Sequence, residues 1–238
     1  MNTSTPAPVG WHTLPTEQVL QELQTAPGGL SDAEAAQRLV LHGPNRLPPP
    51  KRHGPVVRFL LQFHNILIYV LLAAAAVTAL LGHAIDTGII LGVVLINAIV
   101  GFVQEGKAES ALAAIRKMLS LHAMVLRNGQ RREILAEELV PGDWVILQSG
   151  DKAPADLRLI EVKNLRIQEA VLTGEAEAVE KKPNPVAPDA AIGDRTSMVY
   201  SSTLVTYGQG IGVVVATGAA TEIGRISTLL EQVESLVT

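Results

Sequence analysis

The sequence predicts a multidomain membrane protein of the α+β class, in which a small N-terminal helical segment and a two-helix transmembrane hairpin precede a domain of β-strands. Three observations support this prediction. Apolar residues are concentrated in two uncharged runs between residues 59 and 104. The polar region before these runs has helical periodicity. The region after them alternates between apolar and polar residues and is rich in turn signals.

The composition of the 238-residue chain excludes several classes of protein. It contains no cysteine, which excludes a disulfide scaffold, a thiol nucleophile and any cysteine-based metal centre. Charged residues make up 18% and hydrophobic residues 47%, a balance that argues against intrinsic disorder. The net charge of −4 argues against a nucleic-acid partner.

The N-terminal region predicts two short helices. Residues 16–25 place their apolar side chains on one helical face. Ser31 and Glu34 have the spacing of a capping box, which predicts that a second helix opens there and runs to about Leu41. Pro48–Pro50 then forms a stiff linker towards the apolar runs.

Each uncharged run is long enough to cross a membrane as a helix. The first has 27 residues between Arg58 and Asp86, and the second has 18 residues between Asp86 and Glu105. About 20 apolar residues span a bilayer, and both runs are apolar on every face. The expected spans are about Phe59–Leu81 and Thr87–Val103. A pair of buried helices in a soluble protein is the alternative.

The flanking charges predict how the hairpin is oriented. Its tip, about Gly82–Asp86, carries no lysine or arginine. Basic residues lie outside both runs, at Lys51, Arg52, Arg58, Lys107, Arg116 and Lys117. By the positive-inside rule, both termini are therefore expected to be cytoplasmic, and residues 1–15 do not have the pattern of a signal peptide. Asp86 and Glu105 fall at the ends of the second span, where an interfacial position suffices.

The region after the hairpin predicts a compact β-sandwich or barrel. An amphipathic helix is expected to continue over Glu105–Leu119 before the strands begin. Asn128-Gly129 lies between two alternating runs, 124–127 and 130–134, and is typical of a hairpin turn. Further strands are predicted at residues 144–148, 157–162, 165–168, 198–205 and 210–217, with a turn at Tyr207-Gly208, a mobile loop at Pro183–Pro188 and a helix from Thr221.

Three aspartates that lie close together in the sequence raise the question of a metal site. Asp143, Asp151 and Asp156 each lie in or beside a turn, and their spacing does not match an EF-hand loop. Turn hydrogen bonding is the favoured interpretation. The six histidines, at 12, 42, 53, 64, 83 and 122, have no metal-ligand spacing. We therefore expect no metal ligands in this chain.

The order of several short motifs is more specific than any one of them. They are Gly28–Ser31 with Glu34-Ala35 and Arg38-Leu39, Gly43–Asn45, Leu61–Phe63, Asn97–Glu105, Pro141–Asp143, Gly150-Asp151 with Pro154–Asp156, Leu172–Glu175, and Thr217-Gly218 with Thr221–Gly224. In this order and spacing, the sequence resembles the N-terminal part of a type II P-type cation-transporting ATPase of the calcium-pump kind. The resemblance extends from about Trp11 to Thr238.

The resemblance implies three modules: an N-terminal cation-pump segment with its linker (1–55), transmembrane helices one and two with a cytoplasmic extension (56–118), and an actuator domain with a β jelly-roll core (119–238). In this family, the actuator loop Thr-Gly-Glu moves over the phosphorylated domain. The resemblance assigns Glu175 the catalytic role of activating the water that hydrolyses the aspartyl phosphate, with Thr173 and Gly174 as its scaffold.

The chain departs from the family pattern near this loop. Ala176 stands where a serine is usual, Ala178-Val179 replaces a common Pro-Val pair, and Gln168 stands where an acidic residue is frequent. The family's phosphorylated aspartate lies in an Asp-Lys-Thr-Gly motif, which this sequence does not contain. The resemblance therefore implies ATP and magnesium for the complete pump and no cofactor in this chain, which alone is not expected to complete a transport cycle.

The first hypothesis is thus the N-terminal portion of an ATP-driven cation pump, a multi-pass protein of the cell (inner) membrane. Its partners are the lipid bilayer, the transported cation, and the phosphorylation, nucleotide-binding and later transmembrane domains. The identity of the cation stays open. Two alternatives remain: a stand-alone, non-catalytic membrane protein that binds or regulates a partner pump, and a soluble enzyme with a buried helical hairpin.

Overall fold

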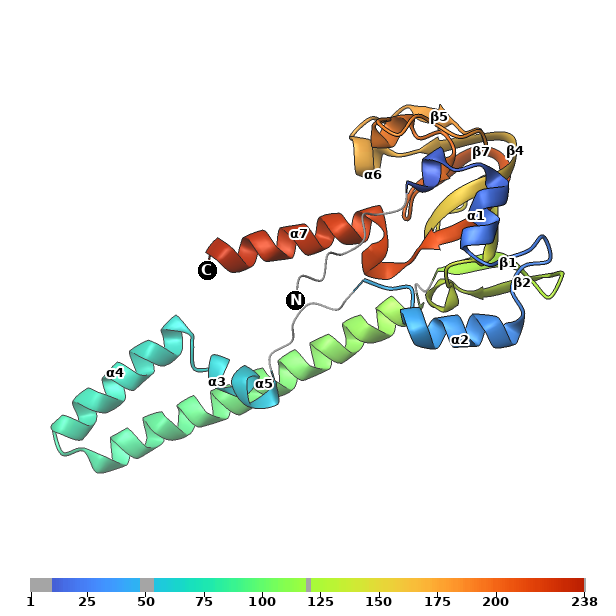
Figure 1. The fold of residues 1–238 in the computed structure, drawn as a ribbon. Helices are drawn as coiled ribbons and strands as arrows, with labels where there is room; N and C mark the ends of the chain where they lie inside the picture. The colour runs from blue at the N-terminus through green and yellow to red at the C-terminus, as the bar shows by residue number, and fades with distance from the viewer. Residues whose placement is uncertain (1–9, 48–53, 119–120, 238) are drawn as a thin grey trace, which may run out of the picture. The chain divides into compact units, whose positions relative to one another are not determined.

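The computed structural model describes residues 10–47, 54–118 and 121–237, and it describes the side chains of all of these except 112–118 and 231–237. The chain divides into two compact units (Figure 1). One combines Met1–Pro48 with Leu121–Thr238, and the other is Pro49–Ser120. The predicted Pro48–Pro50 linker and the basic residues Lys51 and Arg52 lie outside the described residues.

The N-terminal segment of the first unit forms a 3-10 turn, η1 (Trp11–Thr13), and two helices, α1 (Thr16–Glu22) and α2 (Asp32–His42). The predicted capping box is confirmed. The Glu34 amide donates to Ser31 Oγ at 3.2 Å, and the Ser31 amide donates to Glu34 Oε2 at 2.9 Å. Helix α1 ends at Glu22, three residues earlier than predicted, because Gln24 adopts a left-handed backbone conformation with φ 48°.

The β region of the first unit is one antiparallel sheet of seven strands. Its order is β2-β1-β3-β7-β4-β5, and β6 also pairs with β4. The strands are β1 (His122–Arg127), β2 (Gln130–Leu135), β3 (Trp144–Gln148), β4 (Asp156–Gln168), β5 (Ala178–Glu180), β6 (Met198–Val199) and β7 (Leu204–Ala216).

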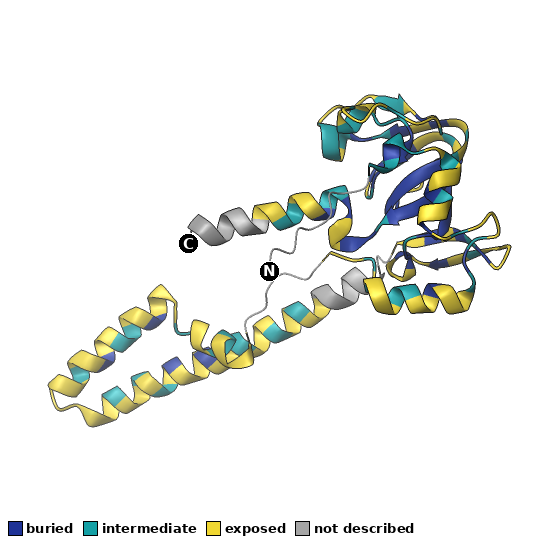
Figure 2. Cartoon of the chain, in the orientation of Figure 1, coloured by how far each residue is buried: buried dark blue, intermediate teal, exposed yellow. Residues whose placement is uncertain are grey.

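Apolar clusters lie on both faces of this sheet, because successive strand residues point to opposite sides. Val145 and Val214 belong to the larger cluster, whereas their neighbours Trp144 and Val213 belong to the second. Val19 of α1 is also buried in the second cluster. In Figure 2 the buried residues lie in the middle of the sheet, where β3 is buried over four of its five residues, whereas β2 is mostly exposed. The N-terminal segment is thus part of the fold of this unit, since it covers one face of the sheet.

One predicted hairpin turn and the bounds of one predicted strand are confirmed, and other predicted turns and strands are wrong. Asn128 and Gly129 have φ of 52° and 72° and form the expected hairpin turn, and β3 has the predicted bounds. The predicted turn at Tyr207-Gly208 is wrong, since β7 continues through it, and the two strands predicted at 157–162 and 165–168 are one strand, β4.

An irregularity of the β4–β7 ladder explains these errors. The register shifts between Lys163 and Arg166, where Asn164 has φ 53° and Gly208 has φ 77°. A Cβ at position 208 would collide with the carbonyl group of Asn164. The sequence signals of a turn therefore mark a bulge within two long paired strands. The strand predicted at 198–205 is interrupted for a similar reason, because Ser202 has φ 68° between β6 and β7.

The remaining elements of this unit are short except for the last. They are η2 (Ala136–Glu138), α6 (Ala170–Thr173), η3 (Ile192–Asp194), η4 (Gly218–Ala220) and α7 (Glu222–Val237). Pro183–Pro188 forms the predicted loop, with no helix or strand. Helix α7 begins one residue after the predicted Thr221, and Asp156 accepts a hydrogen bond from the Glu222 amide at 2.8 Å.

The second unit contains three helices: α3 (Pro55–Leu61), α4 (Ile66–Leu80) and α5 (Ala84–Met118). The first predicted span is not one straight helix, because α3 and α4 meet at a bend of 69°. Asn65 causes α4 to begin anew, since its Oδ1 accepts the Leu67 amide at 2.9 Å. The second predicted span and the expected amphipathic extension form one continuous helix, α5.

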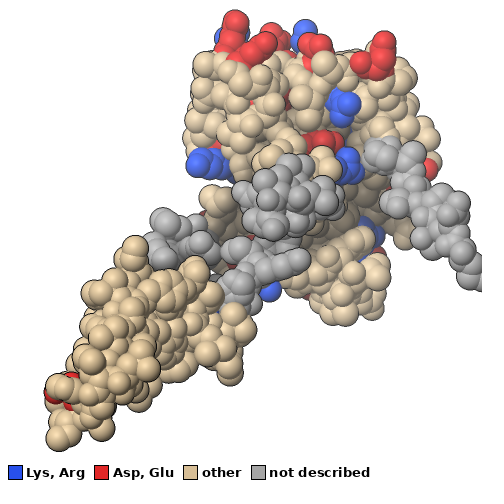
Figure 3. Space-filling model, turned by 90° about the vertical axis from the view of Figure 1, so that its left-hand side faces the viewer, with Lys and Arg blue, Asp and Glu red and all other residues tan. Residues whose placement is uncertain are grey.

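One described helix, α5, is long and apolar enough by itself to cross a membrane, through Ala84–Ala111, and the bent pair α3–α4 raises the number to as many as two. Only 11% of the apolar window of α5 is buried. The face of this unit that Figure 3 shows is largely free of charged side chains. Arg58 of α3 contacts α5 through Glu109 at 2.7 Å and Glu105 at 3.5 Å.

Candidate functional site

The Thr-Gly-Glu sequence lies in a tight connection between two paired strands. Strand β4 ends at Gln168, helix α6 follows at once, and β5 returns antiparallel to the end of β4, with Gln168 opposite Ala178. The connection is anchored at both ends by this ladder. Thr173 is the last residue of α6, and Gly174 and Glu175 follow it.

Gly174 makes the turn that ends α6. Its φ of 76° lies in the left-handed region, and its amide donates to the Ala170 carbonyl at 2.9 Å. Open space surrounds the position that a Cβ would occupy. The backbone conformation, and not a close neighbour, therefore accounts for glycine at this position.

Thr173 links the start of this connection to Glu175. Its hydroxyl donates to the Glu169 carbonyl at 3.2 Å and accepts the Glu175 amide at 3.2 Å. Its methyl group lies against Gly193 of η3, 3.1 Å from the position of a Cβ there. The structure thus brings Thr173, Gly174 and Glu175 into one hydrogen-bonded turn.

Glu175 itself is exposed. Within the described part of the chain, its carboxylate has no hydrogen bond or ion pair, although its amide is held by Thr173. A fixed backbone with an unengaged carboxylate can present a proton acceptor to a group outside this unit.

A buried ion pair lies beside this connection, and the sequence did not predict it. Glu169 Oε1 is 2.6 Å from Lys181 Nζ, and their side chains are 2% and 0% exposed. Burial raises the pKa of Glu169 and lowers that of Lys181, and in each case the charge of the partner opposes the effect. Lys182 is exposed. No signal in the sequence distinguishes which of these adjacent lysines is buried.

The three aspartates considered as metal ligands serve three separate turns. Asp143 is fully buried and accepts two bonds from Arg127, at 2.8 and 2.6 Å, and one from the Val140 amide at 3.0 Å. Asp151 accepts the Gln148 amide, and Asp156 accepts the amides of Ser201 and Glu222. Among the described residues, no three histidine or acidic side chains are grouped to hold a metal ion.

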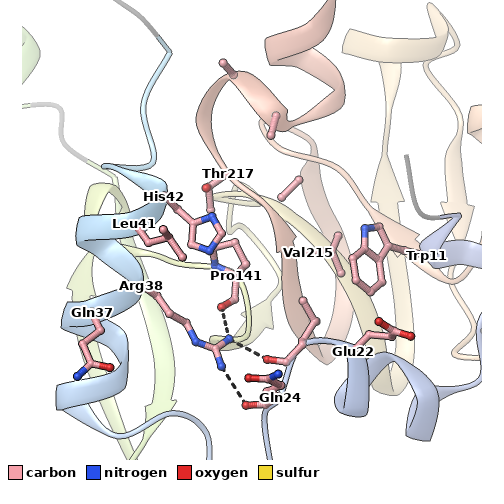
Figure 4. A pocket seen from close by; sticks show the side chains of 14 residues that line it. Trp11, Glu22, Gln24, Gln37, Arg38, Leu41, His42, Pro141, Val215 and Thr217 are labelled. Carbon is pink, nitrogen blue, oxygen red and sulfur yellow. Dashed lines mark hydrogen bonds between the residues drawn. The ribbon is translucent and has the colours of Figure 1, made fainter. Parts of the chain in front are cut away.

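One pocket lies away from the Thr-Gly-Glu turn. It has a volume of about 810 Å³ and is lined by α1, α2 and the end of β7 (Figure 4). Arg38 crosses it, but its guanidinium donates to the backbone carbonyls of Leu23, Gln24 and Pro141. Arg38 thus joins the N-terminal segment to the sheet. Its hydrogen bonds indicate a structural role and not a ligand site.

Asn45 has a similar role. Its amide nitrogen donates to the carbonyls of Ala136 and Pro154, and its oxygen accepts the Gly218 amide at 2.8 Å. Two residues of the motifs that carried the family resemblance, Arg38 and Asn45, therefore fix the N-terminal segment to the connections between the strands.

Two family models match the chain. The P-type ATPase actuator domain matches residues 117–231. The N-terminal region of cation transporters and ATPases matches residues 11–78. The first match includes the whole sheet and the Thr-Gly-Glu turn, and the second includes α1, α2, α3 and most of α4.

Curated relatives give the same result. The chain is 48% identical to the probable cation-transporting ATPase F of Mycobacterium tuberculosis, over 100% of this chain and 26% of that protein. It is 47% identical to the cation-transporting ATPase pma1 of Synechocystis, over 95% and 25%. It is 39% identical to the calcium-transporting ATPase of Bacillus subtilis, over 96% and 26%. The chain thus spans about a quarter of the length of these relatives.

Proposed function

The chain belongs to the family of P-type cation-transporting ATPases, as an N-terminal portion with the actuator domain, and we propose that it promotes aspartyl-phosphate hydrolysis in an ATP-driven cation pump. The observation that carries this proposal is the Thr173–Glu175 turn. It fixes the Glu175 backbone and leaves the carboxylate exposed.

The proposed step is the attack of water on phosphorus. Glu175 accepts a hydrogen bond or proton from the water, the new oxygen–phosphorus bond forms, and the bond between phosphorus and the aspartyl oxygen breaks. Gly174 allows the turn to approach the phosphate without an intervening side chain. The aspartyl phosphate, ATP and magnesium belong to parts of the pump outside this chain.

The experiment uses a chimaera in which this chain replaces the matching quarter of the Bacillus subtilis calcium-transporting ATPase. Glu175→Gln keeps the shape of the side chain and removes its charge. We expect the phosphoenzyme to form normally and to decay about 10²-fold or more slowly after an ATP chase. Glu177→Gln, an exposed neighbour, is the matched control. Decay of the Glu175→Gln chimaera at the parent rate would contradict the proposal.

We also propose that α3–α4 and α5 are the first two membrane spans of a multi-pass protein of the cell membrane. The exposed apolar side chains support this assignment, because Ile66, Leu80 and Ile85 are each at least 80% exposed. The basic flanks favour a cytoplasmic location for both termini. In intact cells, a membrane-impermeant thiol reagent should label His83→Cys and not Ser227→Cys. Labelling of Ser227→Cys alone would reverse the orientation.

The division into modules at residues 1–55, 56–118 and 119–238 and the jelly-roll class of the sheet are part of the same proposal. Its mechanical element is the connection between the sheet unit and the two helical spans. Movement of the Thr-Gly-Glu turn towards the phosphorylated domain would then be transmitted to the membrane helices. Which cation crosses the membrane depends on residues outside this chain.

A further inference from the structure

We propose that Glu169 and Lys181 are positioning residues, which together hold the Thr-Gly-Glu turn in the conformation that presents Glu175. The expected effect of the pair on aspartyl-phosphate hydrolysis rests on the proposed function. The structural part of the inference, that the pair orders this turn, can be tested separately.

The pair joins the two sides of the connection that carries Glu175. Glu169 directly follows β4, and Lys181 directly follows β5. Because these strands are antiparallel, the two residues lie at opposite ends of the short ladder from Arg166 to Gln168. The Lys181 amide bonds to the Leu165 carbonyl at 2.9 Å, and its long side chain reaches back along the ladder to Glu169. The ion pair therefore closes the connection beneath the turn.

A short series of contacts leads from the pair to Glu175. The Glu169 side chain is held by Lys181, and its carbonyl accepts the amides of Leu172 and Thr173 at 2.8 and 3.0 Å. The same carbonyl accepts the Thr173 hydroxyl, which in turn accepts the Glu175 amide. A shift of Glu169 would thus move the acceptor on which the whole turn depends.

The burial of this pair also argues for a positioning role. Transfer of two charges out of water is costly, and apolar or neutral replacements of similar size are often as stable. Among the described residues, neither side chain has another hydrogen-bond partner to offset that cost. The pair is therefore a weak source of global stability. A short, directional contact at the base of the turn is what it provides.

The first experiment measures hydrogen–deuterium exchange of the full 238-residue chain in detergent. The variant Glu169→Gln/Lys181→Met removes both charges and keeps approximate volume. We expect the amides of residues 173–175 to exchange at least about tenfold faster, while the amides of β3 and the thermal midpoint stay unchanged. The matched control is Glu180→Gln/Lys182→Met, which removes an exposed pair at 3.9 Å on the adjacent residues.

Two outcomes would overturn the inference. In the first, amides 173–175 exchange as in the parent chain. In the second, the charge-free variant fails to fold, or amide exchange at residues 173–175 increases no more than exchange in β3 does. Either result would show that the pair stabilises the whole fold and does not specifically order the turn. The single variants Glu169→Gln and Lys181→Met each leave one buried charge, so they are expected to unfold more readily than the double variant.

The second experiment places the same variants in the pump chimaera. We expect Glu169→Gln/Lys181→Met to slow phosphoenzyme decay, with phosphoenzyme formation unchanged and no effect in the control pair. If Glu175→Gln leaves decay unchanged while the exchange result holds, the proposed function fails and the ordering role stands. If Glu175→Gln slows decay and the double variant does not, the positioning inference fails.

Discussion

Two buried ion pairs in the sheet unit differ in how completely they are satisfied. Arg127 and Asp143 meet in two parallel bonds of 2.8 and 2.6 Å. The Val140 amide and the Glu138 carbonyl supply further partners. Glu169 and Lys181 share one close contact of 2.6 Å, and among the described residues they have no other hydrogen-bond partner.

The pKa shifts of the two pairs differ accordingly. Burial alone lowers the pKa of Arg127, but the hydrogen bonds and charge of Asp143 more than offset it, so the pKa is raised. In the second pair burial prevails, since the pKa of Glu169 rises and that of Lys181 falls. We therefore expect the first pair to stabilise the fold, and the second pair, as proposed above, to contribute little to global stability.

The largest expected effect separates these roles. Arg127→Met leaves Asp143 buried without its cation, which should reduce the free energy of unfolding by about 3–5 kcal/mol. Both tryptophans, Trp11 and Trp144, lie in this unit, so urea unfolding followed by fluorescence reports on it alone. By contrast, Glu169→Gln/Lys181→Met should stay within about 1 kcal/mol of the parent. Equal losses in the two variants would remove the distinction.

A third buried carboxylate, that of Asp156, belongs to neither ion pair and makes the stability of the same unit dependent on pH. Asp156 is 3% exposed, and burial raises its pKa to about 6, although the amides of Ser201 and Glu222 oppose the shift. Glu222 adds to the shift, and Arg225 reduces it. Because the folded pKa is raised, the contribution of Asp156 to stability is complete below about pH 4 and is lost as the pH rises through 6.

Asp156→Asn tests this pH dependence, since its amide does not titrate. Between pH 4 and pH 7, the parent chain should lose up to about 3 kcal/mol of unfolding free energy that the variant does not lose. The measurement is urea unfolding at both pH values. Parallel pH profiles for parent and variant would show that Asp156 has an ordinary pKa in the fold.

A smaller effect is expected where the N-terminal segment begins its second helix. Ser31→Ala removes the acceptor of the Glu34 amide and should cost about 1 kcal/mol. Ser31→Thr keeps the oxygen and serves as the control. Because α2 is joined to the sheet through Arg38, the loss should appear in the unfolding of the whole unit and not as local fraying. A loss confined to α2 amide exchange would contradict that coupling.

Local signals in the sequence were sufficient for the elements whose causes are local. The capping box at Ser31, the Asn128-Gly129 hairpin and the apolar helices followed from short patterns. The bulge at Gly208 and the break at Asn65 did not, because a turn signal does not reveal whether the chain reverses or only bends.

The candidate site was only partly predictable, because the sequence reveals those of its features that depend on neighbouring residues. The residues Thr173, Gly174 and Glu175 are adjacent in the sequence, and the structure keeps them together in one turn. The Glu169–Lys181 pair depends on the register of β4 and β5, which no single-strand pattern determines. The pairing of β4 with β5 thus brings Glu169 and Lys181 together, whereas the local sequence motif identifies only the turn residues Thr173, Gly174 and Glu175.

The smallest expected effect concerns the residue after Glu175. Ala176 is exposed, and it makes a contact through its backbone, since its carbonyl accepts a hydrogen bond from the Gln168 side-chain amide at 3.3 Å. Ala176→Ser restores the hydroxyl that is usual in the family without changing this contact or the Thr173 bond to Glu175. In the pump chimaera, phosphoenzyme decay should therefore stay within about twofold of the parent, against about 10²-fold or more for Glu175→Gln. A change in Ala176→Ser as large as that in Glu175→Gln would mean that the hydroxyl at 176 takes part in orienting the water, and that Glu175 does not act alone.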